Sequence, residues 1–89
     1  MRTNNDLETI VKGFANHRRL DIMELLSSES ELSLQEISQR LDINFKTASE
    51  HLRRLVLAGL VVKTNDANYV LHTLTERGRK VLEFITNLK

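Results

Sequence analysis

The side chains in this sequence that could do chemistry are mainly basic, and they are unevenly distributed along the chain. Between Asp21 and Glu36 there are five acidic residues and no lysine or arginine. Between Arg40 and Lys63 there are five basic residues and two acidic ones. A cluster of lysine and arginine is what a phosphate-facing surface requires, although ordinary solvated helix faces fit the same charges.

Other kinds of chemistry find little support in the sequence. The chain has no cysteine, which excludes disulfides and thiolate metal sites. Its histidines, His17, His51 and His72, fall in separate segments without i, i+4 pairing, which disfavours a zinc site. No nucleophile with a base and an orienting partner is visible, nor a phosphate-binding loop or a close carboxylate pair. We therefore expect a protein that is not an enzyme and that needs no cofactor or metal.

Composition and length place the chain among ordinary soluble proteins. It has 89 residues, of which 40% are hydrophobic and 28% are charged, and its net charge is +1. This size supports one core, so we expect residues 1–89 to form a single domain. The sequence opens without the apolar run of a secretory signal, and its apolar stretches are too short to cross a bilayer. A cytoplasmic location is the expectation.

Helical periodicity dominates the first two thirds of the chain. Apolar residues at helical spacing predict helices over 6–16, 17–27, 34–41 and 45–58. Asn16, Ser33 and Asn44 are placed to cap the second, third and fourth of these helices, and Ser33 forms a capping box with Glu36. Gly59 is suited to end the fourth.

The period of the apolar residues changes to two after Gly59. Segments 60–64 and 69–74 have the pattern of strands and are separated by turn residues, which predicts a β-hairpin. Thr75 then caps a last helix over 76–88. Two short helices joined by a tight turn and followed by a hairpin have the order of a winged helix-turn-helix. The predicted fold class is mostly α with a small β-hairpin, in the order α-α-α-α-β-β-α.

Five parts of the sequence resemble the ArsR-type winged-helix repressors. Residues 41–55 read LDINFKTASEHLRRL and are followed by AGLV at 58–61, which is similar to the family's LGxS turn, HLxxL helix and AGLV ending. Residues 16–22, 69–71 and 74–78 resemble the start of the second helix, the returning strand of the wing and the opening of the last helix. The resemblance covers roughly residues 7–88. It implies a transcriptional regulator, most often a repressor, that binds double-stranded DNA as a homodimer with its second motif helix in the major groove.

The chain departs from this family pattern at three places. Where metal-sensing members carry two cysteine ligands it has Ser33 and Gln35, so we expect no metal sensing there. The usual glycine of the turn is Asp42, which can still adopt a left-handed conformation. Asp66 stands at the wing tip, where many members have an arginine, so we expect a weak wing contact.

Helical geometry sorts the residues of segment 45–58 into two faces. Ala48, Leu52 and Leu55 point inward. The residues expected to face DNA are Lys46, Thr47, Ser49, Glu50, Arg53 and Arg54, together with Lys63 of the hairpin. Lys46 and Thr47 lie in the first turn and are the candidates for base edges, whereas Arg53 and Arg54 are better placed for phosphates.

Three residues of this helix have two plausible roles each. Glu50 either accepts a hydrogen bond from a cytosine amine or, as we favour, pairs with Lys46 or Arg53. Phe45 is expected to pack at the core edge rather than against a thymine methyl group, and His51 to be structural.

The first and last helices carry more apolar surface than one small domain can cover, which predicts a homodimer interface. The residues assigned to it are Leu7, Ile10, Val11 and Phe14, with Val81, Leu82, Phe84, Ile85 and Leu88. The main alternative function is a protein-interaction module of the transcription machinery, favoured by the low net charge and by apolar Val56 and Leu57. A ligand-sensing regulator is a further alternative, although 89 residues leave little room for a pocket.

Overall fold

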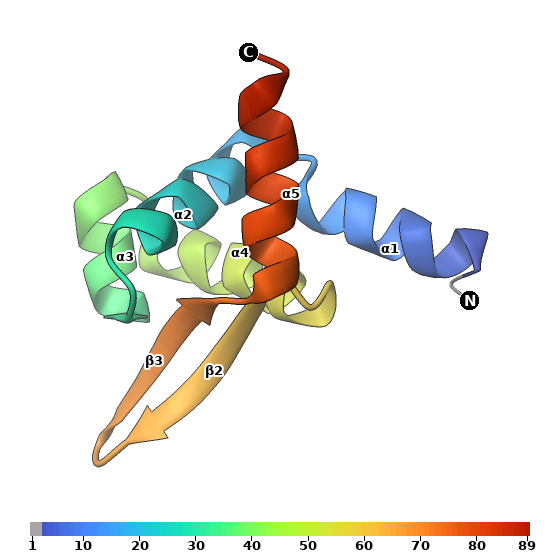
Figure 1. Cartoon of the computed structure of the whole chain (residues 1–89). Coiled ribbons are helices and arrows are strands. Elements are labelled where there is room, and N and C mark those ends of the chain that lie inside the picture. Colours follow the sequence, from blue (N-terminus) through green and yellow to red (C-terminus); the bar gives the residue numbers. More distant parts are fainter. Residues whose placement is uncertain (1–2) are drawn as a thin grey trace.

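The computed structural model describes residues 3–89 and arranges them as five helices and a small sheet (Figure 1). The elements are α1 (Asn4–Phe14), α2 (His17–Ser28), β1 (Leu32–Ser33), α3 (Leu34–Leu41), α4 (Phe45–Leu57), β2 (Val61–Asp66), β3 (Tyr69–Leu74) and α5 (Glu76–Asn87). The predicted fold class, a mostly helical domain with a β-hairpin between its last two helices, is confirmed.

Side-chain caps set where the helices begin. Asn16, Ser33, Asn44 and Thr75 cap α2, α3, α4 and α5 as predicted. The predicted start of the first helix at Asp6 is wrong. Thr3 accepts a hydrogen bond from the Asp6 N–H at 3.1 Å, and the Thr3 N–H donates to the Asp6 carboxylate at 3.2 Å. This capping box starts α1 at Asn4, because it satisfies two N–H groups that would otherwise lack partners.

The sheet has one more strand than the sequence pattern predicts. Its order is β1-β3-β2, with both pairs antiparallel. β1 contains only Leu32 and Ser33, which are too few residues to show alternation, and it pairs with Leu71 and His72 of β3. The buried ring of His72 lies 3.1 Å from the Leu32 carbonyl oxygen through Nδ1, and burial lowers the pKa of this histidine. β1 thereby ties the root of the hairpin to the start of α3.

The hairpin is longer than predicted. β2 extends to Asp66, which pairs with Tyr69, so the turn is reduced to Ala67 and Asn68. Ala67 adopts a positive φ of 55°, a conformation that costs energy for a residue with a Cβ atom. The tight turn keeps the two strands paired to the tip.

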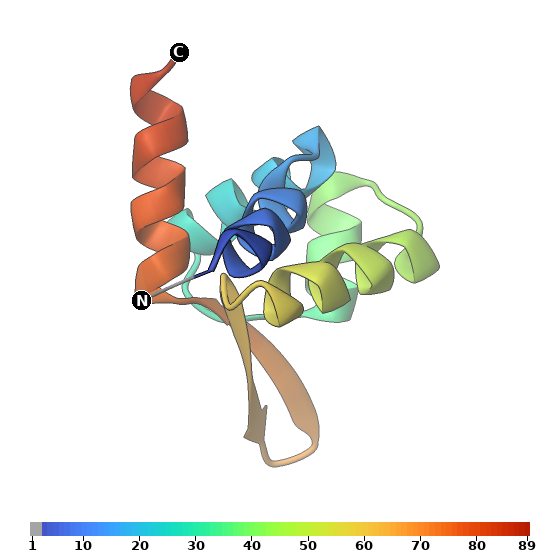
Figure 2. The ribbon, with the colours of Figure 1, turned by 90° about the vertical axis from the view of Figure 1, so that its right-hand side faces the viewer.

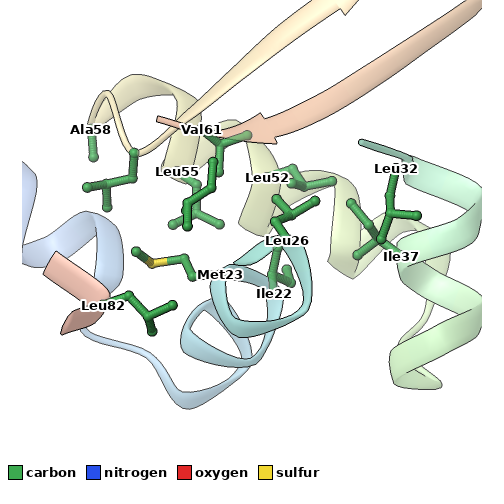
Figure 3. Packing of buried hydrophobic residues seen from close by; sticks show 12 residues of the cluster. Ile22, Met23, Leu26, Leu32, Ile37, Leu52, Leu55, Ala58, Val61 and Leu82 are labelled. Carbon is green, nitrogen blue, oxygen red and sulfur yellow. The ribbon is translucent and has the colours of Figure 1, made fainter. Parts of the chain in front are cut away.

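The core is centred on α2, which contributes Ile22, Met23 and Leu26 (Figure 3). Leu52 and Leu55 of α4 pack against it, and with Ala48 they form the buried face predicted for that helix. The core also contains Ile37, Leu60, Val61, Leu74 and Leu82. Both motif helices and the base of the hairpin are therefore fixed to one framework.

Helices α1 and α5 lie at the periphery, as two views of the ribbon show (Figures 1 and 2). α1 contacts α2 and α4, and only Gly13 of this helix is fully buried. A Cβ atom at Gly13 would collide with that of Ala58, so glycine permits the close crossing of α1 over α4. Within residues 3–89, Leu7 and Val11 of α1 are left exposed.

The residues assigned to the dimer face differ in how exposed they are. Leu7, Val11, Phe84 and Leu88 are exposed. Ile10, Phe14 and Val81 are partly buried against the core, and Ile85 is half-buried. The prediction that Leu82 lies on the outer face is wrong. It is only 9% exposed and belongs to the core, where α5 packs against α2 (Figure 3).

Candidate nucleic-acid interface

The turn between α3 and α4 holds the two helices at a fixed angle. Asp42 takes the left-handed conformation predicted for it, with φ 51° and ψ 49°. The N–H of Ile43 donates to the Ser38 carbonyl at 2.9 Å, which closes the end of α3. Three residues, Asp42 to Asn44, thus separate the two helices of the motif.

Asn44 fixes the first turn of α4. Its side-chain oxygen accepts hydrogen bonds from the N–H groups of Lys46 at 2.9 Å and Thr47 at 3.3 Å. Because the cap orders the backbone, the side chains of this turn project from a rigid support. Lys46 makes no ion pair within residues 3–89. Its ammonium group is available to a ligand.

All seven residues predicted to face DNA are exposed. The structure places Lys46, Thr47, Ser49, Glu50, Arg53 and Arg54 on the outer side of α4 and Lys63 on β2. They form one surface that α4 and the hairpin share, which we call the α4–wing surface.

Glu50 organises the arginines of this surface. Arg53 donates to it through Nε at 2.9 Å and Nη2 at 2.7 Å, and Arg54 donates through Nε at 3.3 Å. The hydrogen bonds from Arg53 lower the pKa of Glu50 to about 2, so its carboxylate is ionised at neutral pH. The favoured pairing with Arg53 is present, Lys46 is not a partner, and Arg54 is an additional one. Glu50 therefore holds two guanidinium groups in place on the exposed face of the helix.

A hollow of about 320 Å³ separates α4 from the wing. Ser49 and Arg53 line it from the α4 side, and Lys63, Val70 and His72 line it from the hairpin. The structure thus brings together Ser49 and Arg53 of α4 and Lys63 of β2, three of the predicted residues, around one hollow.

A smaller hollow, of about 170 Å³, lies on the other side, between α4 and α1. Arg54 and Lys12 line it together with Leu57. Lys12 was missed by the sequence analysis because it lies far from the motif and pairs with Glu8 at 2.7 Å within its own helix. α4 consequently has one pair of basic residues on its wing side and another on its α1 side.

His51 has the structural role predicted for it. Its Nδ1 accepts a hydrogen bond from Arg19 Nε at 3.2 Å, and Arg19 also donates to the Lys12 carbonyl at 2.7 Å. Burial and the neighbouring Arg19 charge lower the pKa of His51, which keeps the ring neutral and able to accept. This contact links α1, α2 and α4.

The predicted packing of Phe45 at the core edge is wrong. The side chain is 56% exposed and belongs neither to the buried cluster nor to the partly buried residues packed against it. Helical periodicity places it near the inward direction, but the side chain of this first residue of α4 is largely exposed.

Residues 16–63 match the family of bacterial regulatory proteins known as the arsR family. The chain belongs to this family. It is also similar to the transcriptional activator HlyU of Vibrio cholerae, with 37% identity over 73 residues that cover 82% of this chain and 67% of the relative. The resemblance found in the sequence is therefore confirmed.

Two solved structures support the same assignment. A homodimeric winged helix-turn-helix DNA-binding domain from Mycobacterium bovis, described as a possible ArsR-family regulator, superposes with a TM-score of 0.86 and 25% identity, covering 94% of this chain and 78% of that one. HlyU from Vibrio cholerae gives a TM-score of 0.81 at 33% identity, over 99% of this chain and 97% of that one. The protein is a transcriptional regulator of the ArsR type with a DNA-binding winged helix-turn-helix, and it is not an enzyme.

Two further findings concern metal-binding groups and membrane-spanning helices. Within residues 3–89, no three histidine, aspartate or glutamate side chains are grouped to hold a metal ion. No helix in the described part of the chain is long and apolar enough to cross a membrane.

Proposed function

We propose that this protein binds specific double-stranded DNA sequences as a homodimer, with α4 in the major groove. The observation that carries this proposal is the arrangement of charge around α4. Its exposed side chains are mostly polar, and a pair of basic residues flanks it on each side.

The arrangement matches the shape of the groove. The major groove of B-DNA is about 12 Å wide and is bordered by two phosphate backbones. A helix lying in it needs cations on both sides, which Arg53 with Lys63 and Arg54 with Lys12 supply. Lys46 and Thr47 then reach base edges, because the first turn of such a helix enters deepest.

The exposed apolar surface of α1 and α5 supports the homodimer. Phe84 and Leu88 are 61% and 67% exposed, and Leu7 and Val11 are also accessible. Large apolar side chains in such numbers on a monomer of this size mark an interface. The related Mycobacterium domain is described as homodimeric. A two-fold symmetric dimer presents two copies of α4 to two half-sites.

Whether binding represses or activates transcription depends on the promoter. Repression is the direction that the family resemblance implies, whereas the Vibrio relative is named an activator. A dimer of this kind can act either way, according to where its site lies relative to the polymerase. Asp66 at the wing tip carries the wrong charge for a close minor-groove contact, so α4 supplies most of the recognition.

Selection of bound sequences from random duplexes, followed by titration, tests the proposal. We expect a palindromic sequence with half-site centres about 10 base pairs apart, bound by two chains. We expect it to bind at least about 1,000-fold more tightly than random duplex at physiological salt.

The alternative function, a protein-interaction module, predicts a different outcome. It is favoured by Leu57, which is 64% exposed near the end of α4. If no sequence is enriched and binding to all duplexes is weak at low salt, this alternative replaces the proposal.

A further inference from the structure

Phe45 is an exposed aromatic residue beside the polar and charged side chains of the first turns of α4. It is 56% exposed, and it precedes Lys46 and Thr47 in the first turn of α4. Leaving such an apolar side chain in water is unfavourable, and covering it with apolar surface is stabilising. An apolar group on the ligand of α4 would therefore bind favourably against Phe45.

Its backbone is held in place before any ligand arrives. The Asn44 cap bonds the two N–H groups that follow Phe45, and the Asn44 carbonyl accepts from the Ala48 N–H at 2.8 Å. The ring is attached to an ordered first turn, so little entropy is lost when it is covered.

We propose that Phe45 contacts the 5-methyl group of a thymine in each half-site. The inference rests on the proposed function, since it assumes that α4 lies in the major groove. Thymine is the base that presents an apolar group there, and phenylalanine is one of the side chains suited to contact it. The first turn is also the part of a major-groove helix that lies nearest to base edges. Phe45 thus determines a preference for thymine at one position of the site.

Other partners fit Phe45 less well. A second copy of the chain would meet the apolar surface of α1 and α5, which lies on other elements. Leu57, the other exposed large apolar residue of α4, lies at the opposite end of the helix beside α1. It serves as the matched control.

The test uses the duplex selected by the full-length protein. Each thymine is replaced in turn by deoxyuridine, which removes only the methyl group, and the dissociation constant is measured for the wild type, Phe45→Ala and Leu57→Ala. For the wild type we expect one position per half-site at which the replacement weakens binding about fourfold, the loss expected for one buried methyl group. Replacing both symmetric positions weakens binding about 16-fold, if the two half-sites contribute independently.

Phe45→Ala should bind thymine and uracil duplexes equally at that position, whereas Leu57→Ala should retain the wild-type ratio. Thermal unfolding checks that both variants fold, and the exposure of Phe45 predicts a small change in midpoint.

Three results overturn the inference. If removing the methyl group of any thymine leaves the dissociation constant unchanged, Phe45 contacts no thymine methyl group. If Phe45→Ala keeps the wild-type ratio, another residue reads it. Both of these leave the proposed function standing. If the wild type itself shows no sequence preference, the proposed function fails and the inference with it.

Discussion

The exposed face of α4 and the exposed faces of α1 and α5 are built in opposite ways. On α4, exposed side chains are mostly polar, and the two arginines are oriented by Glu50. On the outer helices, apolar residues such as Phe84 and Leu88 are more than half exposed within residues 3–89. Both surfaces lie on amphipathic helices that pack on the same core. The difference teaches that the two surfaces suit different partners, and we propose a polyanion for α4 and an apolar surface of a second chain for α1 and α5.

The two surfaces also differ in how firmly the domain holds them. α4 buries Ala48, Leu52 and Leu55 and is capped by Asn44. α1 fully buries only Gly13. The surface that we propose for DNA binding thus lies within one chain, whereas in the proposed homodimer a second chain covers the apolar residues of α1. The following predictions separate the two surfaces.

The largest effect is expected from a charge placed on the apolar surface. Phe84→Glu should shift the protein to monomer and weaken binding to the selected duplex on the order of 100-fold, because two linked half-site contacts become one. Sedimentation and DNA titration measure the two effects. Ser30→Glu adds the same charge in the exposed loop after α2 and should change neither.

Leu82 offers a contrast on the same helix. Leu82→Glu should unfold the domain rather than dissociate a folded dimer, since Leu82 is in the core. If the Phe84→Glu variant instead remains a folded dimer like the wild type, α5 does not form the interface.

A smaller effect of known sign is expected at Glu50. Glu50→Gln removes the charge that pairs with Arg53 and Arg54, so it should strengthen binding to all duplexes by a few-fold, since both guanidinium groups become free for phosphates. Glu76→Gln, which loses the partner of Lys80 on α5, is the control with the same change of charge. If Glu50→Gln instead weakens binding to the selected duplex alone, Glu50 reads a cytosine and our interpretation of this residue is wrong.

No effect is expected from metal ions. Ser33 uses its hydroxyl to accept the Glu36 N–H at 3.2 Å in the capping box of α3, and Gln35 lacks a thiolate. Zinc, cadmium or arsenite should therefore leave DNA affinity unchanged. A tight stoichiometric site found by calorimetry would contradict this and would direct attention to the histidines.

The features that the sequence predicts well are those encoded by neighbouring residues. Caps such as Asn44 and the Ser33–Glu36 box are local patterns, and so is the buried face of α4. The start of α1 at Thr3 was missed although it is also a capping box, because its N3 residue is Asp6 rather than the usual glutamate or glutamine.

The features that the sequence predicts poorly depend on residues that are distant along the chain but close in space. Phe45 and Leu82 were misplaced because periodicity gives the direction of a side chain, but not whether a neighbouring element reaches it. Lys12 lines a hollow with Arg54 only because α1 crosses over α4, and the pairing of β1 with β3 joins residues about 40 positions apart. No local pattern encodes these contacts.

The central claim is that the first turn of α4 reads bases and its later turns contact the backbone. The most direct test is titration of the wild type, Lys46→Ala and Arg54→Ala on selected and random duplexes at several salt concentrations, with Arg79→Ala on α5 as the control. Lys46→Ala should lose about 1–3 kcal/mol on the selected duplex and reduce discrimination among sequences. Arg54→Ala should weaken binding to all duplexes about equally and reduce the salt slope by about one. The claim is contradicted if Arg54→Ala alone reduces discrimination, which would reverse the docking orientation, or if neither variant changes DNA affinity.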